Sequence, residues 1–244
     1  MTIRSVAKGL FRKMGYLVES YNVYRDPAAL LMSLLSSNSI DVVFDVGANE
    51  GQFAGGLRRN GYRGRIVSFE PVAQAYEKLA ANAQGDGSWQ TVKCALGSFD
   101  GKGVINVASS TASSSLLNML PRHVESAPGS KYLRQEQISV RKVDSVIDTY
   151  LTKGERLYLK VDTQGFEKHV IEGAESSLEK IWGIQLEMSL MPLYEGETLI
   201  GDLVDMLSGK NYGLLSLEPI WRDPVTQELL QVDGIFYKKG SSLP

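Results

Sequence analysis

Short apolar runs alternate with amphipathic segments along most of this chain. An apolar run that ends at a glycine or an acidic residue is typical of a buried parallel strand, and apolar positions three or four apart predict a helix. The predicted strands span about 41–46, 65–70, 90–96, 157–161, 184–188, 212–217 and 233–237. The predicted helices span about 1–20, 26–37, 50–60, 72–84, 144–152, 165–181 and 198–209. This alternation predicts an α/β fold, with a mainly parallel sheet and helices on both of its faces.

Residues 98–137 interrupt the alternation. Asp100-Gly101 is a turn signal, 103–107 predicts an extra hairpin arm, and 109–115 is a serine-rich stretch of low complexity. Long loops in compact domains are usually functional or disordered. We expect residues 109–137 to be a lid that orders over the acceptor, and a variable surface loop is the alternative.

The first 40 residues precede the regular alternation and predict two helices. Asp26-Pro27 combines a capping residue with a proline at the first helical position, so it predicts the start of the second helix. Apolar residues at helical spacing in the first helix are Ile3, Val6, Leu10, Met14 and Leu17, and its basic residues are Arg4, Lys8, Arg12 and Lys13. We expect residues 1–40 to pack on the core of a single domain spanning 41–240. Loose association of the first helix with a membrane surface is the alternative.

Composition narrows the class of protein. The chain has 244 residues, 43% hydrophobic and 22% charged, which is typical of a globular domain. Its net charge of −2 gives no basic excess, so nucleic acid is not an expected partner. Cys94 is the single cysteine, which excludes an internal disulfide and fits a cytoplasmic location. No apolar run approaches the roughly 20 residues that span a bilayer, and we identify no signal peptide.

A glycine loop with an acidic partner is the clearest chemical signal. It lies where the first predicted strand turns into its helix, and Gly47 permits a tight turn with close backbone approach. The N–H groups of the following helix could receive a carboxylate, and Asp45 could receive an ammonium group. Glu70 ends the second strand, where it could bind both hydroxyls of a ribose. Together these groups suit S-adenosylmethionine.

A nicotinamide-dependent oxidoreductase is the natural rival, because it also pairs a glycine loop with an acid after the second strand. Its G-x-G-x-x-G pattern needs glycine at positions 47, 49 and 52, but Asn49 and Gln52 occupy the last two. Glu50 would also repel a pyrophosphate. A cofactor-binding protein that has lost catalysis is a further alternative.

Several motifs in a fixed order extend the glycine loop into a family pattern. They are Phe44 to Gly51, Ser68-Phe69-Glu70-Pro71, Ala95-Leu96-Gly97, Lys160 to Glu167, Leu186 to Leu190, Leu193-Tyr194-Glu195-Gly196 and Gln231 to Phe236. With them, residues 41–238 resemble the FkbM family of methyltransferases. Thr163 stands where valine is frequent, which is a mild departure, and the first 40 residues carry no motif of the family.

The resemblance implies a Rossmann-like class I methyltransferase fold with a mostly parallel seven-stranded sheet. It implies O-methylation of a small-molecule or glycosylated acceptor, such as a sugar, glycolipid or polyketide, with S-adenosylhomocysteine as product. The positions that would bind the cofactor are Asp45, Gly47, Ala48, Asn49, Glu50, Gly51, Phe53, Glu70, Pro71, Ala95 and Leu96. The sequence leaves the acceptor and the oligomeric state open.

Methyl transfer to a hydroxyl needs a base or a metal ion, because an alcohol does not ionise alone near neutral pH. Asp162 and Glu187 end neighbouring predicted strands and are our catalytic candidates. The two carboxylates could share one proton or coordinate Mg²⁺, and the metal requirement stays open. Alternatively, Asp162 caps a turn and Glu187 pairs with a basic side chain.

Four further titratable residues are weaker candidates. Glu167 and His169 fall on or near the helix that follows Asp162, and a solvated helix histidine is the simpler interpretation of His169. His123 lies in the irregular region, where it could reach a substrate. Asp233 either points into the site or pairs with a lysine. One cysteine and two histidines cannot form a zinc site of the usual spacing.

Overall fold

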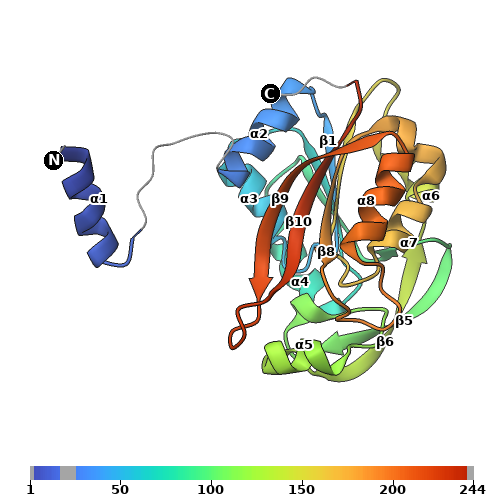
Figure 1. The fold of residues 1–244 in the computed structure, drawn as a ribbon. Helices are drawn as coiled ribbons and strands as arrows, with labels where there is room; N and C mark the ends of the chain where they lie inside the picture. Colours follow the sequence, from blue (N-terminus) through green and yellow to red (C-terminus); the bar gives the residue numbers. More distant parts are fainter. Residues whose placement is uncertain (1–2, 17–25, 241–244) are drawn as a thin grey trace.

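The computed structural model describes residues 3–16 and 26–240 (Figure 1). Its main sheet has seven strands, in the order β3 (Trp89–Val92), β2 (Arg65–Phe69), β1 (Val42–Val46), β7 (Leu157–Val161), β8 (Ile181–Ser189), β10 (Leu229–Lys238) and β9 (Tyr212–Arg222). β10 is antiparallel to both of its neighbours, and the other pairings are parallel. The strand order reverses at β1 and β7, which is where open α/β sheets bind ligands. The predicted mostly parallel seven-stranded sheet is confirmed.

Helices cover both faces of the sheet. One face packs against α2 (Pro27–Ser37), α3 (Gln52–Arg59) and α4 (Ala73–Ala83). The other face packs against α6 (Val143–Tyr150), α7 (Glu167–Glu172), the 3₁₀ helix η4 (Glu175–Lys180) and α8 (Ile200–Gly209). Because both faces are covered, every residue of β1 and β7 is buried, as expected of parallel strands.

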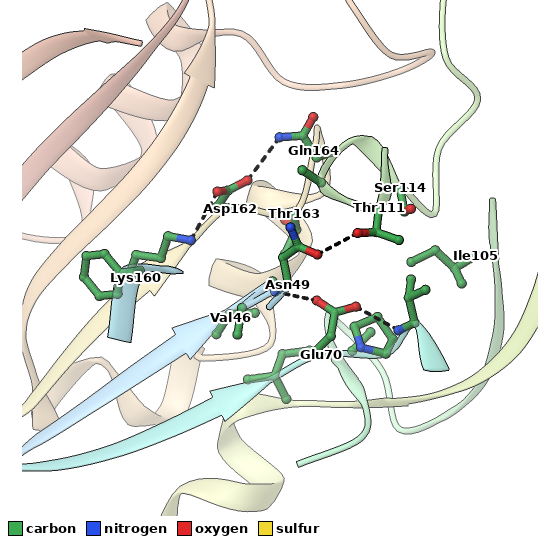
Figure 2. A pocket seen from close by; sticks show the side chains of 18 of the residues that line it. Val46, Asn49, Glu70, Ile105, Thr111, Ser114, Lys160, Asp162, Thr163 and Gln164 are labelled. Atoms are coloured by element: carbon green, nitrogen blue, oxygen red, sulfur yellow. Dashed lines mark hydrogen bonds and ion pairs between the residues drawn. The ribbon is translucent and has the colours of Figure 1, made fainter. Parts of the chain in front are cut away.

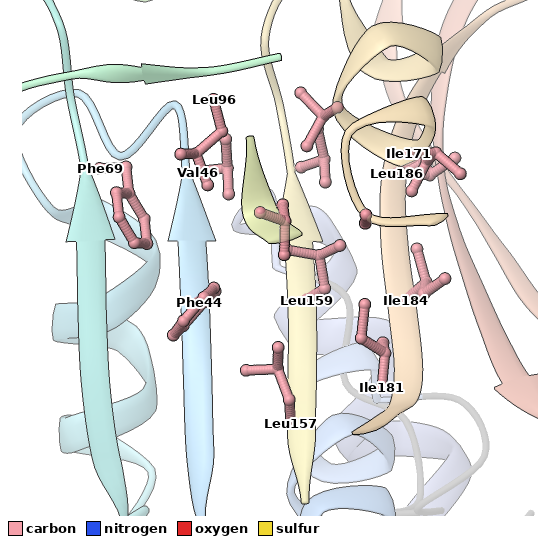
Figure 3. Close-up of a cluster of buried hydrophobic side chains, with 14 of the residues drawn as sticks. Phe44, Val46, Phe69, Leu96, Leu157, Leu159, Ile171, Ile181, Ile184 and Leu186 are labelled. Carbon is pink, nitrogen blue, oxygen red and sulfur yellow. The ribbon is translucent and has the colours of Figure 1, made fainter. Parts of the chain in front are cut away.

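Alternation along β1 divides its side chains between the two cores. Val42, Phe44 and Val46 belong to the cluster beneath α6, α7 and α8, whereas Val43 packs towards α2 and α3. Figure 3 shows the first cluster, in which the rings of Phe44 and Phe69 meet edge to face at 5.1 Å between centroids. The same alternation places Asp45 on the face that α2 and α3 cover.

The two N-terminal helices differ. Asp26 caps α2 by accepting a hydrogen bond from the Ala29 N–H at 3.1 Å, as its sequence predicts. α1 (Ile3–Lys13) lies apart from the domain in Figure 1, and residues 6–16 are exposed. The structure therefore does not show the expected packing of α1 on the core, and that packing stays a prediction. The predicted extension of this helix to residue 20 falls outside the described residues. Within the described ranges, no helix is long and apolar enough to cross a membrane.

The region from 90 to 141 differs most from its prediction. The expected strand 90–96 divides into β3 and β4 (Ala95–Leu96), and β4 belongs to a second sheet of order β4-β6-β5. The remaining elements of this region are β5 (Gly101–Ala108), η2 (Thr111–Ser113), α5 (Pro121–Ser126), η3 (Pro128–Ser130) and β6 (Tyr132–Arg141). The hairpin arm is confirmed, since β5 pairs antiparallel with β6. The prediction of one long irregular loop over residues 98–137 is wrong, because part of it forms β6. This strand is polar and mostly exposed, so a search for apolar runs cannot detect it.

Two local predictions after residue 140 also change. Lys142, rather than Asp144, is the capping residue of α6, and Asp144 instead accepts hydrogen bonds from Ser176 and Ser177. The predicted helix 165–181 is broken into α7 and η4. Gly173 lies at the break, where a Cβ would come within 1.9 Å of the Gly97 carbonyl oxygen.

Candidate active site

A cavity of about 300 Å³ lies at the carboxyl ends of β1, β2 and β7 (Figure 2). Among the residues predicted to bind a cofactor, those that line it are Gly47, Ala48, Asn49, Phe53, Glu70, Pro71, Ala95 and Leu96. Asp162, the first catalytic candidate, also lines it. Strand ends from distant parts of the chain thus bring the glycine loop and the candidate base to one space.

The glycine loop fits closely against the end of β7. Gly47 has a φ of +74°, and a Cβ there would lie 1.8 Å from the carbonyl oxygen of Asp162. Only glycine meets both conditions, because other residues disfavour this φ and have no room for a side chain. Asn49 also has a positive φ, of 48°, which asparagine tolerates better than most residues. The backbone of the loop therefore approaches the end of β7 closely beside the cavity.

Glu70 is fixed by the backbone on both sides. Its Oε2 accepts the Asn49 N–H and its Oε1 accepts the Val72 N–H, each at 2.8 Å. Burial raises the pKa of Glu70 to about 7, although these two N–H groups oppose the rise. A carboxylate has about four lone-pair directions, so each oxygen can still accept a hydroxyl. This geometry fits the two hydroxyls of a ribose.

An apolar slot continues from Glu70. Ala95 and Leu96 line it together with Val72 and Ile105, which is the chemistry that an adenine ring requires. The second sheet supplies part of this wall, because Ile105 lies on β5. The slot, the Glu70 carboxylate and the glycine loop follow one another along the cavity, in the order of the adenine, ribose and methionine parts of S-adenosylmethionine.

The serine-rich segment closes over the glycine loop. The hydroxyl of Thr111 donates to Asn49 Oδ1 at 2.8 Å, and Thr111, Ala112, Ser114 and Leu116 line the cavity. Figure 2 shows Thr111 and Ser114 on the opposite side of the cavity from the strand ends. Coverage of the cavity by this segment is compatible with the lid hypothesis, and movement of the segment stays a prediction.

Asp162 lies at the other end of the cavity, held between two side chains. Its Oδ2 accepts the Lys160 ammonium at 3.2 Å, and its Oδ1 accepts the Gln164 amide at 3.1 Å (Figure 2). Lys160 Nζ also lies 3.6 Å from Asp45 Oδ1. Burial would lower the pKa of Lys160, but Asp162 and Asp45 outweigh it, so this pKa is raised. The ammonium is therefore a fixed positive charge beside the candidate base.

Gln164 joins the two catalytic candidates. Its side-chain amide donates both to Asp162 and to Glu187 Oε2, which also accepts the Gln231 amide at 3.0 Å. Burial and the charge of Asp162 raise the pKa of Glu187 well above its usual value. Glu187 does not line the cavity. Asp162 and Glu187 are thus not in direct contact through a shared proton, as expected, but are bridged by the side-chain amide of Gln164. In this arrangement Glu187 orients Gln164.

A second layer of buried groups fixes Gln164 itself. The Tyr194 hydroxyl donates to Gln164 Oε1 at 2.6 Å and lies 3.0 Å from His123 Nε2. The other ring nitrogen of His123 lies 3.0 Å from the Ser130 hydroxyl. Burial lowers the pKa of His123 to about 4, so this ring is neutral. His123 is thus a buried support, and the suggestion that it reaches a substrate from a loop is wrong.

Three predicted cofactor ligands lie outside the cavity lining. Asp45 is completely buried, accepts the Ser68 hydroxyl at 3.1 Å and faces Lys160 rather than an ammonium of a ligand. Glu50 pairs with Lys78 at 2.6 Å on the outer side of the loop. Gly51 packs on Trp89 and Leu79. The loop therefore lines the cavity at Gly47, Ala48 and Asn49, and it leaves the cavity at Glu50 and Gly51.

Of the weaker catalytic candidates Glu167, His169 and Asp233, only Asp233 lines the cavity. Glu167 accepts hydrogen bonds from the N–H groups of Thr163 and Gly165, so it caps that turn. His169 stacks on Phe166 with 4.0 Å between ring centroids and does not line the cavity. Asp233 does line the cavity, where burial raises its pKa to about 6.

In the described part of the chain, no group of three or more His, Cys, Asp or Glu side chains is arranged to hold a metal ion.

A second, more apolar cavity of about 210 Å³ adjoins the first between α2, α3 and the strands β9 and β10. The two cavities share Gln52, Phe53, Gln185 and Asp233. Helix α2, which precedes every family motif, forms one wall through Leu31 and Met32.

Sequence reasoning missed Lys160 and Gln164. A signal existed for Lys160, since a lysine inside the otherwise apolar run 157–161 must be buried and paired. No comparable signal marked Gln164. Its positive φ of 56° and its contacts with β8 and Tyr194 depend on the assembled fold.

Comparisons with known proteins find a family model and several solved structures that are similar to this chain. A family model described as "Methyltransferase FkbM domain" matches residues 45–214. The chain is similar in structure to a precorrin-6y C5,15-methyltransferase from Geobacter metallireducens, at 12% identity over 86% of this chain and 87% of that one, with a TM-score of 0.45. It is also similar to an rRNA methylase from Streptococcus thermophilus, at 10% identity over 91% and 98% of the chains, with a TM-score of 0.46. A comparison with curated protein sequences gives no match.

The family match spans both the glycine loop and Asp162 within one methyltransferase domain. The nicotinamide oxidoreductase alternative is therefore wrong, and the Rossmann-like class I methyltransferase fold is confirmed. The chain belongs to the FkbM methyltransferase family and is an S-adenosylmethionine-dependent methyltransferase.

Proposed function

We propose that this enzyme transfers a methyl group to a hydroxyl oxygen of a sugar, glycolipid or polyketide-type acceptor, with Asp162 as the general base. One observation carries the proposal. Asp162 is a carboxylate that lines the cavity beside the glycine loop, and Lys160 and Gln164 hold its two oxygens from opposite sides. A base held in this way can meet a hydroxyl in a defined direction.

The residues that would hold the cofactor follow from the lining of the cavity. Gly47, Ala48 and Asn49 would lie beside the methionine part, Glu70 would bind the ribose, and the slot at Ala95 and Leu96 would hold the adenine. When bound, S-adenosylmethionine supplies an electrophilic methyl group on a sulfonium.

The chain contributes positioning and proton removal. The Lys160 ammonium balances the charge of Asp162, and the Gln164 amide fixes the carboxylate plane. A lone pair of Asp162 would accept the hydroxyl proton of the acceptor as that oxygen takes the methyl group, and neutral S-adenosylhomocysteine would be the leaving group. Glu187 and Tyr194 act through Gln164 and are positioning residues.

The second cavity supports an acceptor with an apolar part. It is lined largely by apolar groups, including Leu31, Met32, Leu57 and Ile235, and it meets the first cavity at Phe53. A free monosaccharide would leave such a surface unmatched, whereas a glycolipid or polyketide could cover it.

The test is turnover by Asp162→Asn. We expect the rate of S-adenosylhomocysteine release to fall by about 10²–10⁴-fold, which is the usual contribution of general base catalysis. Binding of S-adenosylhomocysteine should change little, and Asp148→Asn, which alters an exposed carboxylate on α6, should leave both unchanged.

The acceptor panel should pair each hydroxyl compound with its deoxy analogue. Release of product only with the hydroxyl member supports O-methylation. Release with both members contradicts it. Cofactor binding without release for any acceptor would favour the inactive alternative, and full activity of Asp162→Asn would remove Asp162 from the mechanism.

A further inference from the structure

Helix α1 has two chemically distinct sides. Val6 and Leu10 lie four residues apart on one side of the helix, and Met14 continues this spacing in the turn directly after its end. Lys8 and Arg12 are also four apart, offset by two positions, so they lie on the opposite side. The first acidic residue of the chain is Glu19, beyond the end of the helix.

The apolar side of α1 is not used by the domain. Val6 is 58% exposed, Leu10 61% and Met14 54%. The helix lies apart from the sheet and its covering helices in Figure 1. Water contact with several large apolar side chains in a row is unfavourable, so a helix of this kind is stable mainly when another surface covers the stripe.

We propose that α1 binds the surface of a membrane that contains anionic lipids. A helix with a basic face and an apolar face lies in the plane of the membrane, its apolar stripe among the upper acyl chains and its lysines and arginines beside the phosphates. The charges decide between this surface and a second copy of the chain. Two α1 helices packed through their apolar sides would leave Lys8 and Arg12 of each facing water without a partner, whereas anionic headgroups neutralise them.

This inference does not depend on the proposed acceptor. If the acceptor is a glycolipid, α1 would keep the enzyme at the surface where such an acceptor is found. A variant that no longer binds membranes should still methylate an acceptor that is dispersed in water, because Asp162 is unchanged. One of the two proposals can therefore be contradicted while the other stands.

The experiment is sedimentation of the full chain with vesicles. One set contains phosphatidylcholine alone, and the other contains about one third phosphatidylglycerol. We expect at least about tenfold stronger partitioning to the anionic set, and we expect it to weaken at high salt because the charges are screened.

Two variants, each with a matched control, test the apolar side and the basic side of α1 one at a time. Leu10→Glu should lower partitioning by at least about tenfold, because a charge must enter the apolar boundary. Leu133→Glu makes the same change at a residue of β6 that is 65% exposed, and it should change partitioning less than about twofold. Lys8→Glu should lower partitioning by about tenfold, and Lys102→Glu on exposed β5 should not.

Every outcome bears on the proposal. Equal binding to neutral and anionic vesicles, or unchanged binding by Leu10→Glu, overturns it. A dimer formed without vesicles and lost in Leu10→Glu also overturns it, because a second copy would then cover the stripe. Binding of S-adenosylhomocysteine by each variant verifies that the domain is folded, since the altered side chains lie on an exposed helix.

Discussion

The two ends of the main cavity each present a carboxylate, and they hold it by different means. Glu70 is fixed by two backbone N–H groups, from Asn49 and Val72. Asp162 is fixed by the side chains of Lys160 and Gln164, which in turn depend on further side chains. Both carboxylates lie at strand ends, so the sheet alone does not explain the difference.

Because the backbone holds Glu70 and side chains hold Asp162, we expect the two ends of the cavity to respond differently to substitution. At the Glu70 end the path of the backbone is decisive, and a change in the loop alters the site directly. At the Asp162 end a chain of side chains from β7, β8 and residues near Tyr194 shares the task. A change there should weaken orientation in steps, through residues that touch neither cofactor nor acceptor.

Gly47→Ala should have the largest effect, because it acts on both ends at once. The new Cβ would meet the Asp162 carbonyl and would also occupy an unfavourable φ. We expect about 3–5 kcal/mol lower unfolding free energy, measured by urea denaturation, and loss of S-adenosylhomocysteine binding. Gly61→Ala is the control for φ alone, since Gly61 has a φ of +96° in open space and should cost about 1–2 kcal/mol. Equal costs for the two variants would contradict the close approach of the loop to β7.

Glu70→Gln should act on the cofactor end only. A glutamine can accept one of the two backbone N–H groups but presents an NH₂ to the other. We expect calorimetry to show S-adenosylhomocysteine binding weakened by about 1.5–3 kcal/mol, the worth of hydrogen bonds to a charged group. Glu50→Gln changes a carboxylate of the same loop that points outwards to Lys78, and it should bind normally. If both variants bind equally weakly, the charge of the loop matters more than the position of Glu70.

The pH dependence of binding should sharpen this result. Burial raises the pKa of Glu70 to about 7 without ligand, and ribose hydroxyls favour the ionised form. Binding therefore releases a proton below that pKa, and affinity for S-adenosylhomocysteine should fall roughly tenfold from pH 8 to pH 6. Glu70→Gln should flatten the profile. Asp233→Asn should be measured beside it, because Asp233 lines the cavity and its pKa is raised to about 6. A profile that flattens only in Asp233→Asn would assign the proton to that residue.

Local patterns predicted the cofactor end better than the acceptor end. The turn at Gly47 and the acid at Glu70 are set by short segments whose meaning depends on one strand–helix connection. Asp45, Glu50 and Gly51, which the pattern predicts to bind the cofactor, lie outside the cavity lining, since the pattern marks the loop but does not say which of its residues the turn directs outwards. Lys160 was missed although it interrupts a buried strand and its partner Asp162 is only two residues away, because its second partner, Asp45, lies on another strand.

The acceptor end depends on contacts between distant segments. Gln164 meets Glu187 across 23 residues, Tyr194 across 30, and Tyr194 meets His123 across 71. The second sheet was missed for a related reason, since polar β6 is recognisable only by its pairing with β5. Side-chain networks and exposed strands leave no periodic trace in the sequence.

Tyr194→Phe should give the smallest effect and the clearest sign of a graded network. It removes the hydroxyl that orients Gln164 and contacts His123, yet Tyr194 is buried away from the cavity lining. We expect kcat to fall about fivefold, close to 1 kcal/mol, while S-adenosylhomocysteine binding is unchanged. Tyr212→Phe removes a buried hydroxyl that bonds the Leu178 and Ile181 carbonyls far from Asp162, so it should lower stability similarly and leave kcat intact. A kcat that falls equally in both variants would mean that general loosening, rather than orientation of Gln164, governs the acceptor end.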